Sequence, residues 1–196
     1  MKEKDFNIVV CASGGGGNFQ SLILHQEIFH YKILLLIVDR ECYAIERAKN
    51  QGIPYVVIPK TVGWDVEFEK VIPSNVQLIV LAGFFPIIPE WICQKWSKKI
   101  INTHPSLLPK YGGKGMYGVK VQEAVILNKE KYAGCTIHYV DSGIDSGEVI
   151  LQKMIDVDYS WTPYELGGKV FEEEIKLLPI AIGKIREKWK KMKKSW

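Results

Sequence analysis

The segment "FNIVVCASGGGGNFQSLIL", residues 6–24, joins an apolar run, four consecutive glycines and a stretch with helical spacing. The run 6–12 is rich in β-branched residues and is typical of a buried strand. The glycines allow a tight turn, and the apolar spacing after residue 18 predicts a helix. Because open α/β sheets often begin with a strand, a glycine turn and a helix, we expect an α/β protein.

Further apolar runs repeat this arrangement along the amino-terminal half of the chain. Predicted buried strands are "ILLLIV" (33–38), "YVVI" (55–58) and "VQLIVLA" (76–82). Helical spacing is found in "NFQSLILHQEIF" (18–29) and "YAIERAKNQG" (43–52), and the second of these ends on a glycine, as helices often do. Strands that alternate with helices indicate a parallel sheet with right-handed crossovers and helices on both faces.

The order of elements changes after residue 115. We expect a helix over 117–128, strands over 134–140 and 147–157, and a long helix from about Thr162, where "TPYEL" supplies Thr, Pro and Glu at the N-cap, N1 and N3 positions. The connection between the two strands is short, which favours an antiparallel pair at the edge of the sheet. The predicted fold is thus an open, mostly parallel sheet with an antiparallel edge, in a single domain over residues 1–196.

Charge and composition narrow the classes of partner. The net charge is +4, but residues 184–196 carry seven Lys or Arg against one Glu, so the rest of the chain is slightly acidic. We expect this tail to be a solvated helix end, with contact to an acidic surface as the alternative, and we expect no nucleic-acid binding. No apolar run approaches the roughly 18 residues of a membrane span, and no secretory signal is evident, so a cytoplasmic protein without a membrane partner is expected.

Cysteine spacing gives no indication of a metal site or a disulfide framework. The four cysteines are far apart and form no CxxC pair, and we expect them to be reduced and mostly buried. They are Cys11, Cys42, Cys93 and Cys135.

The glycine loop "ASGGGGNFQ" (12–20) is a predicted phosphate site. Backbone N–H groups and a helix N-terminus attract a phosphate at the carboxyl end of a strand. The loop fits neither G-x-G-x-x-G nor a Walker motif, which favours a phosphate monoester over a dinucleotide. Asp39, at the end of the second predicted strand, could instead be the ribose-binding acid of a dinucleotide site, and a purely structural turn is the third alternative.

A second group of polar residues is predicted at the segment "INTHP" (101–105). Side chains two apart on a strand share one face, so Asn102 and His104 should lie in one cleft. An amide that donates to a developing oxyanion and an imidazole that exchanges protons suit attack by an amine on a carbonyl. The loop "DSGIDSG" (141–147) could bring Asp145 to the imidazole. Asp141 follows a strand directly and is more typical of a turn.

The other three histidines, His25, His30 and His138, are more typical of structural residues.

The motifs "INTHPSLLPKYGGKG" (101–115), "LAGFF" (81–85) and "GCTIHYVDSGIDSGEVILQ" (134–152) together resemble the folate-dependent formyltransferases, and the similarity runs from about residue 6 to about residue 183. The resemblance implies a Rossmann-like fold. It also implies transfer of the formyl group of 10-formyltetrahydrofolate to the amine of phosphoribosylglycinamide, in purine biosynthesis and without a metal.

The resemblance also implies roles for individual residues. Asn102, His104 and Asp145 correspond to the catalytic residues, and Asn102, Asp141 and Asp145 also to folate contacts, with backbone groups of 141–145 at the pterin. Further correspondences are Gly16, Gly17 and Asn18 at the substrate phosphate, Glu174 near the substrate ribose, and Phe85, Pro86, Ile87 and Ile88 on the wall that contacts the pterin. The alternative for 84–88 is ordinary core, and spacing alone would place Glu174 on a solvated helix face.

The chain departs from this family at the folate wall. Many relatives have an arginine where this chain has Pro86, and a second arginine, which meets the folate tail in some relatives, has no clear counterpart in 61–77. Residues 66–77 are also short for a helix plus a turn. The alternatives are a sugar-nucleotide amine N-formyltransferase and, from another class, a non-catalytic dinucleotide-binding module. Either a monomer or a homodimer is expected.

Overall fold

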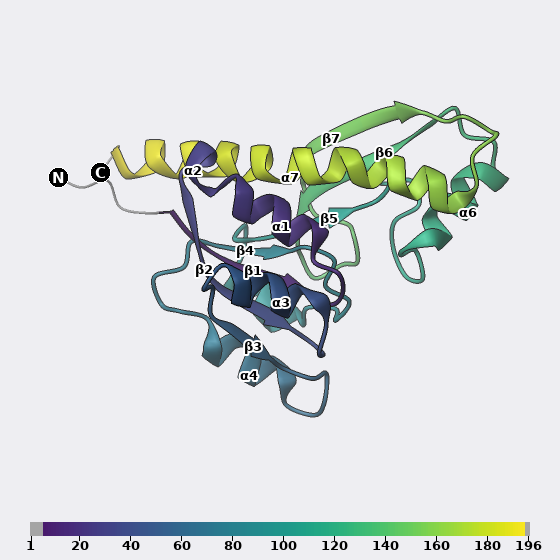
Figure 1. Ribbon diagram of the computed structural model, residues 1–196. Helices are drawn as coiled ribbons and strands as arrows, with labels where there is room; N and C mark the ends of the chain where they lie inside the picture. Colours follow the sequence, from purple (N-terminus) through teal and green to yellow (C-terminus); the bar gives the residue numbers. More distant parts are fainter. Residues whose placement is uncertain (1–5, 195–196) are drawn as a thin grey trace.

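A computed structural model describes residues 6–194, and within these residues seven strands form one sheet (Figure 1). The strands are β1 (Phe6–Ala12), β2 (Tyr31–Val38), β3 (Tyr55–Val57), β4 (Leu78–Leu81), β5 (Ile100–His104), β6 (Tyr132–Tyr139) and β7 (Val149–Asp156). The order is β3-β2-β1-β4-β5-β6-β7, parallel through β5 and antiparallel for β6 and β7. The predicted mostly parallel sheet with an antiparallel edge is confirmed.

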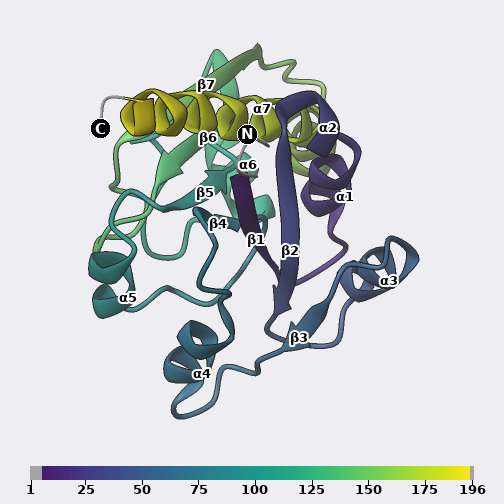
Figure 2. The same ribbon diagram turned by 90° about the vertical axis from the view of Figure 1, so that its left-hand side faces the viewer.

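Helices cover both faces of the sheet (Figure 2). They are α1 (Gly17–Leu24), α2 (Gln26–Phe29), α3 (Tyr43–Asn50), α4 (Trp64–Val71), α5 (Glu90–Lys95), α6 (Val119–Leu127) and α7 (Pro163–Lys194). The alternation along β1 shows how the two layers form, because Ile8 and Val10 pack in one apolar cluster with α1, α3 and α7, whereas Val9 and Cys11 pack in the other with α4 and α5.

Several element predictions need correction. β3 is an edge strand with an exposed Tyr55, because it pairs only with β2, and of the run 55–58 only Ile58 is buried. The helix predicted over 18–29 is divided at His25 into α1 and α2. The segment 66–77 is short for a helix and a turn because the helix α4 begins before it, at Trp64. α5 was not predicted, because six residues are too few to show a helical period.

The long carboxy-terminal helix begins with the predicted cap. The Thr162 backbone N–H donates to Glu165 Oε2 over 2.7 Å, and the Glu165 backbone N–H donates to Thr162 Oγ1 over 3.2 Å. The lysine-rich tail continues this helix to residue 194, while residues 195 and 196 lie outside the described part. The tail is only partly solvated, because Arg186 is buried and the Trp189 ring packs edge-on against Phe6.

The topology positions the polar loops. Strands β2 and β3 extend the sheet on one side of β1, and β4 begins the other side. Ligands of open α/β sheets bind at the carboxyl ends of strands near such a switch point. The glycine loop after β1, the segment 82–88 after β4 and the end of β5 all lie there. Among residues 6–194, no helix has both the length and the apolarity to cross a bilayer.

Candidate active site

The end of β5 brings the predicted polar residues together. His104 is buried and Asn102 half-buried, and Thr103, between them, is hydrogen-bonded to Glu174 of α7. His104 Nδ1 lies 3.5 Å from Asp145 Oδ2, across the cleft formed with the loop after β6. The predicted association of Asn102, His104 and Asp145 is therefore present in the structure.

Both ring nitrogens of His104 face oxygen acceptors. Nε2 lies 2.8 Å from the carbonyl oxygen of Tyr111, and Nδ1 faces the Asp145 carboxylate. A carbonyl oxygen can only accept, so Nε2 carries a proton and donates it to Tyr111.

Asp145 is held by the backbone of two glycine-rich loops. Its backbone has a positive φ of 55°, a left-handed conformation that Asp adopts more readily than most residues, and its Oδ2 accepts a hydrogen bond from the Gly113 N–H over 3.0 Å. Asp141 Oδ1 accepts from the Gly143 N–H over 3.0 Å and from Ser146 Oγ over 2.7 Å. The prediction that Asp141 forms a turn is thus confirmed.

His138, predicted to be a structural histidine, is buried and hydrogen-bonded, and it also lies beside this cluster. It is directly opposite Asn102 in the β5–β6 register, and its Nε2 lies 3.2 Å from Asn102 Nδ2 and 3.7 Å from Asp145 Oδ1. Burial lowers the pKa of His138 below that of an ordinary histidine, despite the opposing effect of its hydrogen bond to Tyr139 and of Asp145. The neutral ring is therefore favoured.

The glycine loop is closely packed at two positions. Gly16 has a positive φ of 68°, and a Cβ there would lie 2.8 Å from Ala44 Cβ. A Cβ on Gly17 would lie 2.5 Å from Phe171 Cζ. Arg47 of α3 braces the loop, since its Nε donates to the Gly15 carbonyl over 2.8 Å. The left-handed backbone and the close approach of Ala44 thus require glycine at residue 16, whereas a side chain at residue 17 would have to displace the Phe171 ring.

A buried carboxylate connects this loop to β5. Glu174 Oε1 accepts hydrogen bonds from Asn18 Nδ2 over 2.9 Å and from Thr103 Oγ1 over 2.7 Å. Glu174 is buried, which corrects the solvated helix face that spacing alone predicted. Burial raises its pKa, although both hydrogen bonds oppose the change. Asn18 Oδ1 is buried without a hydrogen-bond partner.

The predicted folate wall divides into two sets. Phe85 and Ile87 are exposed by 60% and 59%, whereas Pro86 and Ile88 are buried. The ordinary core predicted as the alternative therefore applies only to the second pair, together with Phe84. Two large apolar side chains are left facing outward beside the carboxyl end of β4.

An arginine accompanies the exposed wall. The Arg40 guanidinium lies 5.6 Å from the centre of the Phe85 ring, and its Nη2 donates to Asp39 Oδ2 over 2.7 Å. Burial would raise the pKa of Asp39, but hydrogen bonds from Arg40 and Ser13 lower it below its usual value. Only Oδ2 of Asp39 is engaged by Arg40, and its Oδ1 is buried without a hydrogen-bond partner. The Phe85 N–H donates to Ser13 Oγ over 2.9 Å and ties the wall to the glycine loop.

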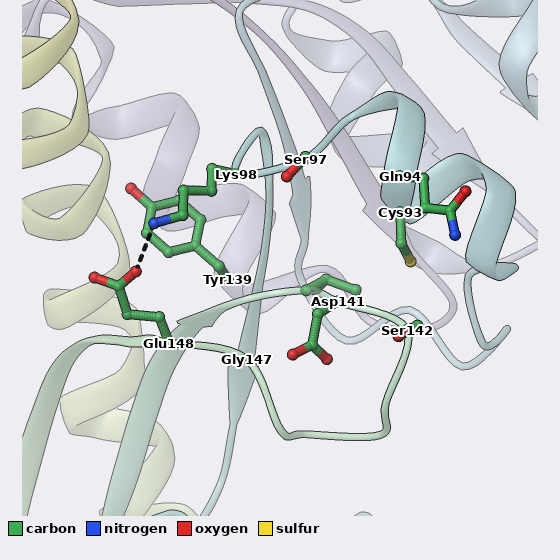
Figure 3. A pocket seen from close by; sticks show the side chains of 10 residues that line it. Cys93, Gln94, Ser97, Lys98, Tyr139, Asp141, Ser142, Gly147 and Glu148 are labelled. Atoms are coloured by element: carbon green, nitrogen blue, oxygen red, sulfur yellow. Dashed lines mark hydrogen bonds and ion pairs between the residues drawn. The ribbon is translucent and has the colours of Figure 1, made fainter.

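A cavity of about 330 Å³ lies between α5 and the loop after β6 (Figure 3). Cys93 and Gln94 of α5 line one side, and Asp141 and Ser142 line the other. An ion pair of 3.0 Å between Lys98 and Glu148 lies at its border.

All four cysteines are free thiols, three of them buried, and residues 6–194 contain no cluster of His, Cys, Asp or Glu arranged to hold a metal.

Comparison with known proteins agrees with this geometry. Phosphoribosylglycinamide formyltransferase, chloroplastic, of Arabidopsis thaliana is 35% identical over an alignment of 200 residues, which covers 93% of this chain and 67% of that protein. Phosphoribosylglycinamide formyltransferase of Bacillus subtilis (strain 168) is 36% identical over 182 residues, covering 88% of this chain and 91% of that protein.

Solved structures agree with the sequence comparisons. The crystal structure of phosphoribosylglycinamide formyltransferase from Anaplasma phagocytophilum superposes with a TM-score of 0.86 and 31% identity, over 94% of this chain and 89% of that one. The family described as formyl transferase matches residues 6–182, which include the glycine loop, β5 and the loop that carries Asp145. The chain therefore belongs to the formyltransferase family.

Proposed function

We propose that this protein transfers the formyl group of 10-formyltetrahydrofolate to the amine of phosphoribosylglycinamide, a step of purine biosynthesis. The observation that carries the proposal is the cluster of Asn102, His104 and Asp145 at the carboxyl end of β5. It lies in a chain whose relatives are named phosphoribosylglycinamide formyltransferase. The dinucleotide alternative loses support, because the family match and the named relatives are formyltransferases.

The proposed reaction is a direct transfer. The glycinamide nitrogen attacks the formyl carbon, and the carbonyl oxygen becomes an oxyanion that accepts hydrogen bonds from Asn102 and from the protonated ring of His104. When the bond between the formyl carbon and N10 of the folate breaks, a proton passes from the former amine to N10. Asp145, 3.5 Å from His104, stabilises the imidazolium and fixes the orientation of the ring.

The glycine loop is the proposed phosphate site. Backbone N–H groups of Gly16, Gly17 and Asn18 lie at the start of α1, where a phosphate is favoured by unpaired N–H groups and the helix dipole. Glu174 is proposed to accept a hydrogen bond from the substrate ribose. Because Glu174 bonds both Asn18 and Thr103, it also holds this loop in a fixed position relative to the catalytic strand.

The folate is proposed to lie between the exposed wall and the loop after β6. Phe85 and Ile87 supply apolar contacts, and backbone groups of 141–145 supply donors and acceptors for the pterin edge. Pro86 removes the cation and the backbone N–H that an arginine would supply there, so a lowered folate affinity is proposed. A cytoplasmic location and a monomeric or dimeric state stay predictions.

The experiment is a spectrophotometric assay of folate deformylation with phosphoribosylglycinamide present or omitted, for the wild type and for His104→Ala. Deformylation that requires the amine and is lost in the variant supports the proposal. Deformylation at the same rate without the amine would identify a hydrolase and overturn it. A sugar-nucleotide amine as a second acceptor tests the remaining alternative within the family.

A further inference from the structure

The hydrogen bonds of His138 define which of its nitrogens carries the proton. Nδ1 lies 2.9 Å from the carbonyl oxygen of Tyr139, which can only accept, so Nδ1 carries the N–H. The ring is almost fully buried and favours the neutral form. Nε2 therefore presents a lone pair, and the group that faces it over 3.2 Å is the amide of Asn102.

This lone pair determines how the Asn102 amide is oriented. An amide nitrogen carries two hydrogens and its oxygen carries none, so only Nδ2 can form a hydrogen bond with an unprotonated Nε2. One hydrogen of Nδ2 is directed at His138, and the other, on the same planar group, remains available for the formyl oxygen. If the amide were rotated by 180°, Oδ1 would face the lone pair of Nε2, and two acceptors would repel each other.

We propose that His138 is a positioning residue, which accepts a hydrogen bond from Asn102 and thereby keeps an amide N–H directed at the oxyanion. The inference rests on the proposed formyl transfer. It adds a fourth residue, from β6, to the group formed by Asn102, His104 and Asp145. His138 itself acts only through Asn102.

Protonation of His138 would reverse this arrangement. A protonated Nε2 is a donor, so it would favour Oδ1 of Asn102 in place of Nδ2, and it would also attract Asp145 Oδ1, now 3.7 Å away. The titratable groups that act on His138 are His104 of β5 and, from the loop after β6, Asp141 and Asp145, while its register partner on β7 is the apolar Val149. Both catalytic partners would be disturbed by one added proton.

The first test compares His138→Leu with His138→Gln by steady-state formyl transfer at neutral pH. Leu removes the acceptor, whereas the Gln side-chain oxygen is as many bonds from Cβ as Nε2 and can accept from Asn102. We expect kcat of His138→Leu to fall about 10- to 100-fold, less than the roughly 100- to 1,000-fold expected for loss of an oxyanion donor. KM should change little, and His138→Gln should recover most of kcat.

A double-mutant cycle distinguishes positioning from a general structural role. In the Asn102→Ala background, His138→Leu should cause no further loss, because there is no amide left to orient. His25→Leu, which removes a histidine from the end of α1, is the matched control and should retain wild-type kcat. Equal losses in both backgrounds would overturn the proposal, and so would wild-type kcat in His138→Leu.

A pH profile keeps the proposal testable if His138→Leu does not fold. His138→Gln cannot be protonated, so its kcat divided by that of the wild type should rise as the pH falls below the ordinary pKa of histidine. A ratio that stays constant with pH would contradict the inference. Failure of formyl transfer in the wild type itself would refute the proposed function, and is thereby distinguished from failure of this inference.

Discussion

Gly147→Ala should reduce catalysis by displacing Asp145. Gly147 closes the loop after β6, and a Cβ there would lie 1.8 Å from the carbonyl oxygen of Tyr139, whereas real Cβ contacts are essentially never shorter than 3.0 Å. The obstacle is backbone, so the loop has to move by about 1 Å or more. A displacement of 1 Å at a reacting group can cost about 100-fold in rate, which is the expected fall in kcat.

The assay is formyl transfer at saturating amine and folate, with the far-ultraviolet circular dichroism of each variant as a check of folding. Gly168→Ala is the matched control, because nothing lies within 4 Å of its Cβ position on α7. It should retain kcat and stabilise the protein by up to about 1 kcal/mol. Wild-type kcat in a folded Gly147→Ala variant would refute the argument that this loop must hold Asp145 in place.

Three further predictions follow from the site. Burial raises the pKa of Glu174, so above the ordinary glutamate pKa the folded protein holds a proton that the unfolded chain has lost, and the free energy of unfolding falls as the pH rises. In thermal unfolding, the Glu174→Gln variant should lose this pH dependence. The same pH dependence in the variant would contradict the prediction. Gly17→Ala should raise KM for phosphoribosylglycinamide, because the added Cβ would lie 2.5 Å from Phe171 Cζ. Adding Phe171→Ala should restore KM toward the wild-type value. Additive effects of the two substitutions on KM would exclude this clash as the cause. Arg40→Ala should raise KM for the carboxylate-bearing folate about two- to fivefold, because it removes an exposed cation beside Phe85 of the proposed folate wall. An unchanged KM would show that Arg40 makes no contribution to folate binding.

The strands and the positions of the candidate catalytic residues Asn102 and His104 could be predicted because each depends on local sequence. A run such as "FNIVVCA" becomes a buried strand wherever a parallel sheet forms, and the spacing of Asn102 and His104 fixes a shared face. The capping residues of α7 likewise act within four positions. For Asp145, the sequence indicated only that its loop is long enough to reach the end of β5.

Features that depend on register or on distant packing could not be predicted in this way. His138 meets Asn102 because β6 pairs antiparallel with β5 in one particular register, and the sequence does not specify that register. Glu174 is buried because α7 crosses both the glycine loop and Thr103, which reverses the expectation for a charged run on a helix. Arg40 and Phe85 meet only once β2 and β4 flank β1 in the sheet.

The most direct test of direct formyl transfer follows the carbon itself. The protein would be incubated with phosphoribosylglycinamide and a folate whose 10-formyl carbon is ¹³C, and the products would be observed by NMR. We predict that the label appears in the formyl amide of the glycinamide product, at a rate that His104→Ala abolishes. Label that appears as free formate, or an amide that forms equally well in His104→Ala, would contradict transfer by this site.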